Sequence, residues 1–137
     1  MLFPYKDDNP RVLVPYVTYA IISINVLIFV LQLNMAMVNS SIEREFIYKF
    51  GFIPANFSFF TMFTSMFLHG GFSHIFGNMW FLWVFGDNVE GILGHIKFGI
   101  FYLLCGLVAT MSQLFVNPES TIPMVGASGA IAGVLGM

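Results

Sequence analysis

Ser128 is the residue of this chain whose surroundings best suit covalent chemistry. It lies in the segment Gly126-Ala127-Ser128-Gly129, among small residues that let other backbone approach closely. An apolar run follows from Ala130 to Met137. A serine hydroxyl becomes a nucleophile when a base takes its proton and when donors stabilise the oxyanion that forms. The segment therefore predicts a serine nucleophile at the start of an apolar helix.

A second pair of polar residues, His74 and Asn78, could supply those donors. They are four residues apart, so on a helix both side chains project from one face, one turn from each other. Polar side chains in a membrane helix usually face a bundle interior or a wet cavity. The alternative is that they only hold helices together, at about 0.6 kcal/mol per hydrogen bond. With Ser128 on another helix, they form a candidate donor set for an oxyanion.

The composition places these residues in a membrane. Hydrophobic residues make up 58% of the 137 residues and charged residues only 9%, against about 25% in soluble domains. Four stretches carry no charge at all, namely 12–42, 50–86, 98–118 and 120–137. About 20 apolar residues suffice to cross the hydrocarbon core. The chain is therefore predicted to be an integral membrane protein, and its net charge of −2 without a basic block argues against a nucleic-acid partner.

We expect an all-α, polytopic helix bundle with three spans and the start of a fourth. The first span is apolar on all sides, and Asp87-Asn88 and Glu90-Gly91 are expected to close the second near the bilayer surface. Cys105 is expected to be a packed thiol within the third span. The expected spans are 16–35, 74–85, 97–115 and a fourth that begins at Ser128.

The segment 38–67 is predicted to be a structured loop in the membrane interface. Ser40-Ser41 is a possible helix cap, and residues 43–50 mix charged and aromatic side chains in the interfacial manner. Gly51 and Pro54 are expected to break that helix. Five phenylalanines follow, namely Phe57, Phe59, Phe60, Phe63 and Phe67. So many aromatic side chains would not lie free in water, which favours the membrane interface.

Residues 1–15 form a polar N-terminal segment without the features of a cleaved signal peptide, so the first span is expected to remain in the mature protein. Two domains are expected, this segment and a membrane domain over 16–137. The N-terminal segment is predicted to lie in the cytoplasm, because that orientation places three cations inside and two outside. The three are Lys6, Arg11 and Lys97, and the two are Arg44 and Lys49.

Several motifs in order resemble the rhomboid family of intramembrane serine proteases. They are Thr64-Ser65-Met66-Phe67-Leu68-His69-Gly70-Gly71, then His74-x-x-x-Asn78, then Gly86-Asp87-Asn88-Val89-Glu90, and finally Gly126-Ala127-Ser128-Gly129. The loop Gly51-Phe52-Ile53-Pro54-Ala55 resembles that of bacterial members. The resemblance extends from the start at Asp8-Asn9-Pro10 to the end of the chain.

The resemblance implies a role for each matching residue. Ser128 would be the nucleophile, and His74, Asn78 and the backbone N–H of Ser128 would stabilise the oxyanion. His69 would be structural, and Glu90 would tie the end of the second span to its surroundings. Gly126 and Gly129 support the serine motif, and Gly133, with its small neighbours, allows close helix packing.

The resemblance also implies a histidine base on a sixth span, packed against the fourth. None of His69, His74 and His95 is placed as that base, since His95 is assigned to a surface turn. We therefore expect a fragment of a six-span protein, inactive by itself, whose fourth span is too short to cross and whose glycine face lacks a partner. The alternative is a naturally short relative that acts with another chain.

The function that the resemblance implies is cleavage of transmembrane segments in single-span substrates, without metal or cofactor, in a bacterial inner membrane. The substrate sequence and the oligomeric state are left open. A non-proteolytic rhomboid-like protein that binds membrane clients is the alternative. A small transporter or channel has no need of these two motifs, and Ala130 departs from the Gly-x-Ser-x-Gly elbow of soluble hydrolases.

Overall fold

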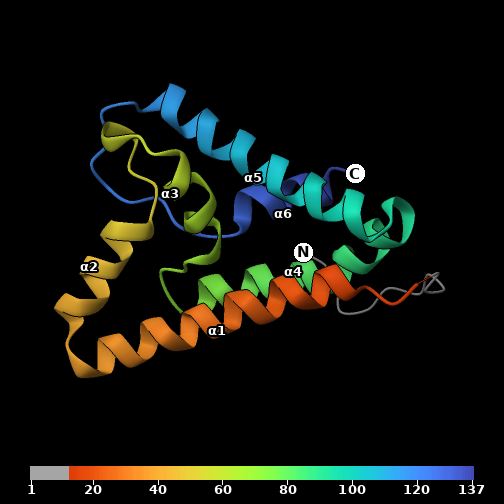
Figure 1. Cartoon of the computed structure of the whole chain (residues 1–137), viewed down its shortest axis with the longest axis horizontal. Coiled ribbons are helices and arrows are strands. Elements are labelled where there is room, and N and C mark those ends of the chain that lie inside the picture. The colour runs from red at the N-terminus through yellow and green to blue at the C-terminus, as the bar shows by residue number, and fades with distance from the viewer. Residues whose placement is uncertain (1–12) are drawn as a thin grey trace.

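The computed structural model describes residues 13–137, and all the regular elements among them are helices (Figure 1). An isolated antiparallel bridge joins Phe52 to Met124. The predicted all-α class is confirmed for this part of the chain. In order, the helices are α1 (Tyr16–Val38), α2 (Ser40–Phe50), η1 (Pro54–Asn56), α3 (Phe59–Thr64), η2 (Ser65–Phe67), α4 (Phe72–Leu93), α5 (His95–Val116) and α6 (Ser128–Leu135).

Two of the described helices are long and apolar enough to cross a membrane. These are α1, with a mean hydropathy of 2.2, and α5, with 1.8. Helix α4 has 22 residues but does not meet the same criteria, because His74, Asn78, Asp87 and Glu90 make it more polar. The first and third expected spans are thus supported by length and composition, whereas the span in α4 stays a prediction.

Helix α1 is not apolar on all sides, contrary to our expectation. Its buried positions follow one stripe of which three members are polar, Thr18, Asn25 and Gln32, all without exposed surface. These three residues are spaced by seven, so they lie on one face of the helix, which packs against α4. Figure 1 shows the two helices side by side.

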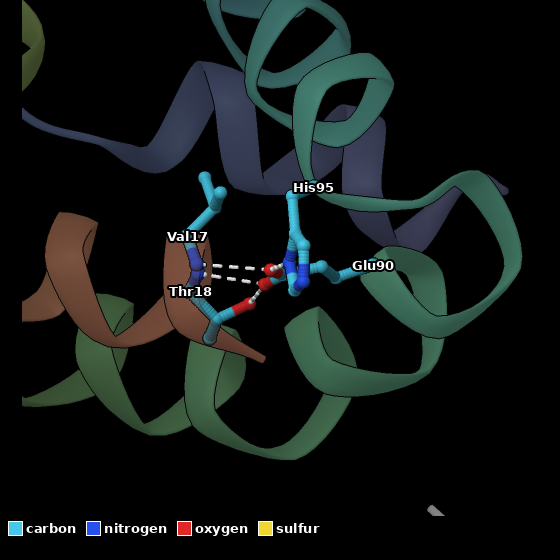
Figure 2. Close-up of polar contacts among 4 residues, drawn as sticks. All are labelled: Val17, Thr18, Glu90 and His95. Atoms are coloured by element: carbon cyan, nitrogen blue, oxygen red, sulfur yellow. Dashed lines mark hydrogen bonds and ion pairs between the residues drawn. The ribbon is translucent and has the colours of Figure 1, made fainter. Parts of the chain in front are cut away.

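Helix α4 is longer than expected at its C-terminal end. It continues through Asp87 and Glu90 to Leu93, so the helix extends beyond the expected span 74–85, and the prediction that these residues close the span near the bilayer surface stays a prediction. Glu90 is fully buried, because it accepts hydrogen bonds from the N–H groups of Val17 and Thr18, at 2.9 and 2.8 Å, and from the Thr18 hydroxyl at 2.7 Å (Figure 2). A carboxylate at the N-terminus of α1 also complements the helix dipole.

The segment 38–67, predicted to be a structured loop, contains four short helices, α2, η1, α3 and η2. The cap of α2 is Asn39, whose side chain accepts a hydrogen bond from the N–H of Ser41 at 2.8 Å, so the prediction of a Ser40-Ser41 cap was wrong. The break at Gly51 and Pro54 is confirmed. Gly51 is held close to the next segment, since a methyl group on it would lie 2.9 Å from Cβ of Pro123.

Helix α6 lies between α4 and α5 and packs against both (Figure 1). Its two glycines face α5, because a methyl group on Gly129 would collide with Ala109 and one on Gly133 with Cys105. The expectation that the glycine face lacks a partner was therefore wrong. Cys105 is a packed thiol within α5, as predicted.

Candidate functional site

Ser128 is the first residue of α6 and is exposed. Ala127 precedes it as a fully buried N-cap that provides no side-chain hydrogen bond to the helix. The first N–H groups of a helix have no partner within the helix, so the N–H of Ser128 is available to a ligand. The Ser128 hydroxyl likewise makes no hydrogen bond with any residue that the structure describes.

Gly126 connects the serine loop to α4. Its φ of +119° lies in the region that favours glycine. A methyl group there would lie 2.6 Å from both Cε1 and Nε2 of His74 and 3.7 Å from Nδ2 of Asn78. Both predicted oxyanion donors therefore face the backbone two residues before Ser128. This position needs glycine for its backbone conformation and also for the close approach.

Backbone hydrogen bonds hold the serine loop against the segment 51–67. The N–H of Phe52 donates to the carbonyl of Met124 at 3.0 Å, and the N–H of Met124 donates back at 2.7 Å. The N–H of Gly126 donates to the carbonyl of Ser65 at 2.9 Å. That N–H is therefore already used. The first loop thus fixes the position of the residues that lead into Ser128.

His74 lies in the first turn of α4 and directs Nε2 toward Gly126. Its Nδ1 accepts a hydrogen bond from the N–H of Gly70 at 3.4 Å. In a neutral imidazole with an accepting Nδ1, the proton is on Nε2. The nitrogen beside the serine loop is then a donor, as stabilisation of an oxyanion requires.

Asn78 lies one turn further along α4 and is buried. Its Nδ2 is 3.0 Å from Nε2 of His69. Burial and the nearby ring of His74, whose centroid is 5.1 Å away, lower the pKa of His69 to about 4. His69 lies in the short segment between η2 and α4 and is therefore neutral at neutral pH, with one ring nitrogen free to accept the amide N–H.

Gln32 of α1 holds His69 from the other side, and the sequence analysis missed it. Its Nε2 donates to the carbonyl of His69 at 2.9 Å, and its Oε1 accepts from the N–H of His69 at 3.1 Å. The seven-residue spacing from Thr18 through Asn25 to Gln32 is the signal that could have identified a buried polar face.

The structure brings some of the predicted site residues together and separates others. His74 and Asn78 meet at Gly126, two residues before Ser128, whereas Gly129 faces α5. His95 is the first residue of α5 and not part of a surface turn as predicted, and its Nδ1 is 2.5 Å from Oε1 of Glu90 near the C-terminal end of α4 (Figure 2). The described residues include no group of three or more His, Cys, Asp or Glu that could hold a metal ion.

Comparison with known proteins gives matches across most of the chain. A family model described as "Rhomboid domain" matches residues 56–137. "Rhomboid protease GluP" of Bacillus subtilis is 32% identical over 123 residues, which cover 89% of this chain and 24% of that protein. "Rhomboid protein 1, mitochondrial" of Saccharomyces cerevisiae is 30% identical over 138 residues, which cover 98% of this chain and 38% of that protein.

A plant protein is also similar over a shorter stretch. "RHOMBOID-like protein 6, mitochondrial" of Arabidopsis thaliana is 38% identical over 74 residues, 53% of this chain and 23% of that protein. The chain thus spans less than two fifths of the length of these three relatives. No solved structure gives a significant match.

Proposed function

Because the chain belongs to the rhomboid family of membrane proteins, we propose that it is part of an intramembrane serine endopeptidase with Ser128 as its nucleophile. The observation that carries this proposal is the contact of Gly126 with both His74 and Asn78. It sets two donors beside the loop that ends in an exposed, unbonded serine hydroxyl.

The chemistry would proceed by acyl transfer. The Ser128 oxygen attacks the carbonyl carbon of a peptide bond while a base takes the hydroxyl proton. The carbonyl oxygen becomes an oxyanion that accepts hydrogen bonds from Nε2–H of His74, Nδ2–H of Asn78 and the N–H of Ser128. Return of the proton to the leaving amine breaks the C–N bond, and water then releases the acyl group from Ser128.

We assign the base to a histidine outside these 137 residues. His69 accepts from Asn78, and His74 serves as a donor. His95 pairs with Glu90 at the opposite end of α4. The open side of α6 could receive the segment that carries the base, because Ser128 and Ala132 are exposed one turn apart.

The substrates would be single-span membrane proteins cut within or beside their transmembrane segment. Ser128 is exposed, and no cofactor is required for the acyl transfer described above. The cytoplasmic N-terminus stays a prediction, since Lys6 and Arg11 lie outside the described residues, as does most of the expected N-terminal segment 1–15. The boundary of the membrane domain at residue 16 likewise stays a prediction.

The test uses the full-length protein in liposomes with a labelled single-span substrate. The wild type should release a cleaved fragment and react with a fluorophosphonate probe, whereas Ser128→Ala should do neither. Ser112→Ala is the matched control, because Ser112 is exposed on α5 and bonds only within that helix, to the carbonyl of Val108. Cleavage by Ser128→Ala would refute the assignment. Binding of substrate by the wild type without cleavage would support the non-proteolytic alternative instead.

A further inference from the structure

We propose that His69, held in place by Gln32, orients the side-chain amide of Asn78 as an oxyanion donor. Both residues are then positioning residues, and α1 takes part in catalysis without contacting substrate. This inference rests on the proposed function, since it assigns a cause to the geometry of one of its donors.

The contacts form one continuous chain from α1 to the serine loop. Gln32 binds both the N–H and the carbonyl of His69, at 3.1 and 2.9 Å. The ring of His69 then meets Nδ2 of Asn78 at 3.0 Å. The same Nδ2 would be 3.7 Å from a methyl group on Gly126. Gln32 and His69 are almost without exposed surface, so water does not compete for these bonds.

The direction of the His69–Asn78 bond decides which end of the amide faces the site. An accepting ring nitrogen on His69 selects the NH₂ end of Asn78, and that group has a second N–H to offer. A donor at the same place would select the carbonyl oxygen instead and turn the NH₂ end away from Gly126. The acceptor on His69 therefore fixes the amide in the orientation that an oxyanion needs.

The two hydrogen bonds between Gln32 and the backbone of His69 explain how the loop keeps this ring in place. The residues from Leu68 to Gly71 lie between η2 and α4, outside both helices. The single side-chain amide of Gln32 engages both backbone polar groups of His69, its N–H and its carbonyl, and so holds a residue that lies outside any helix. An amide buried in this way is costly unless both ends are bonded, and here both ends are.

The first experiment compares His69→Phe with His69→Gln in the full-length enzyme. Phenylalanine keeps the ring volume without an acceptor, so kcat should fall by about 10- to 100-fold. The upper limit is the loss of a whole oxyanion donor, which lowers kcat by about 100- to 1,000-fold. KM should change by less than about twofold, because only an interaction made in the transition state is lost. Glutamine can place an oxygen where Nε2 lies, so it should recover kcat to within about fivefold of the wild type.

A double-mutant cycle separates positioning from general damage. If His69 acts through Asn78, His69→Phe should have little further effect on kcat in an Asn78→Ala background. Equal losses in both backgrounds would overturn the proposal, and so would failure of His69→Gln to recover kcat when its thermal unfolding matches that of the wild type. Ser128→Ala, measured in parallel, tests the proposed function separately. An active Ser128→Ala would refute the protease assignment itself.

The second experiment addresses Gln32 on α1. Gln32→Leu removes both bonds to His69 and should lower kcat without a matching change in KM, in the same direction as His69→Phe. Asn34→Leu is the control, since Asn34 is exposed on α1 and bonds only to the carbonyl of Val30. Equal kcat values for Gln32→Leu and Asn34→Leu would show that α1 does not act on the site.

Discussion

The imidazole of His74 lies against the α-carbon of Gly126, so closely that a methyl group there would be 2.6 Å from the ring. This contact joins two parts of the chain that are distant in sequence, the first turn of α4 and the loop before α6. It also sets the spacing between the predicted donors and the predicted nucleophile.

Gly126→Ala should therefore abolish cleavage. The new methyl group would press on the His74 ring, and a φ of +119° is strained for alanine. Gly77→Ala is the matched control on α4, because nothing lies within 4 Å of a methyl group there. That control should keep activity and gain up to about 1 kcal/mol in stability. Cleavage assays on both variants decide the matter, and an active Gly126→Ala would contradict the observed contact.

The close packing of α6 on α5 predicts a loss of stability in Gly133→Ala. The added methyl group would collide with the Cys105 side chain, and overpacking of this kind costs about 1–3 kcal/mol. Gly136→Ala has only ordinary contacts, the nearest at 3.5 Å, and should be close to neutral. Thermal unfolding in detergent should separate the two variants. Equal unfolding midpoints for the two variants would contradict the packing of Gly133 against α5.

Much of the site could be predicted from the sequence because its signals are local. The four-residue spacing of His74 and Asn78 fixes their common face, and the small residues around Ser128 mark a close approach. Gln32 could not be predicted in the same way. The role of Gln32 depends on the backbone of His69, which lies in another segment. Nothing in the apolar sequence of α1 indicates that partner.

The end of α4 shows why the fold was predicted less well at its polar positions. Asp87 and Glu90 suggest a bilayer surface when hydropathy is considered alone. The structure buries Glu90 because the N–H groups at the start of α1 satisfy its carboxylate. Likewise Ser40-Ser41 has the composition of a cap, but Asn39 precedes it and takes that role. The burial of Glu90 depends on a tertiary partner, and the identity of the cap depends on the exact residue at which α2 starts.

Glu90→Gln should destabilise the protein strongly. The amide keeps the shape but turns an NH₂ group toward donors that the carboxylate now satisfies, and leaving a buried donor without its partner costs about 1–3 kcal/mol. Glu45→Gln, at an exposed position on α2, should leave stability almost unchanged. The measurement is the unfolding midpoint of each variant in the same detergent. Equal unfolding midpoints for Glu90→Gln and Glu45→Gln would contradict a structural role of Glu90.

The lowered pKa of His69 predicts a dependence of stability on pH. The folded protein has a pKa of about 4 at this residue, against 6.5 as the ordinary value. Between these limits the unfolded chain binds more protons, so stability is full above pH 6.5 and is lost as the pH falls toward 4. His74 is the titratable group that faces His69 and is unchanged in the comparison that follows.

The check is to unfold the wild type and His69→Gln at pH 7 and pH 4.5. The wild type should lose more stability between the two values than the variant, which has no titrating group at this position. Losses of equal size in both proteins would assign the pH dependence to other groups.

The bonds from Phe52 to Met124 and from Ser65 to Gly126 have a consequence for how the chain folds. Each joins segments that are far apart in the chain, and such pairings form late because the intervening chain must first be brought together. During synthesis, the first loop emerges long before its partner. Ser128 therefore gains its place only after α4 and α5 have been made, so the candidate site is completed late in folding, when the surrounding helices are present.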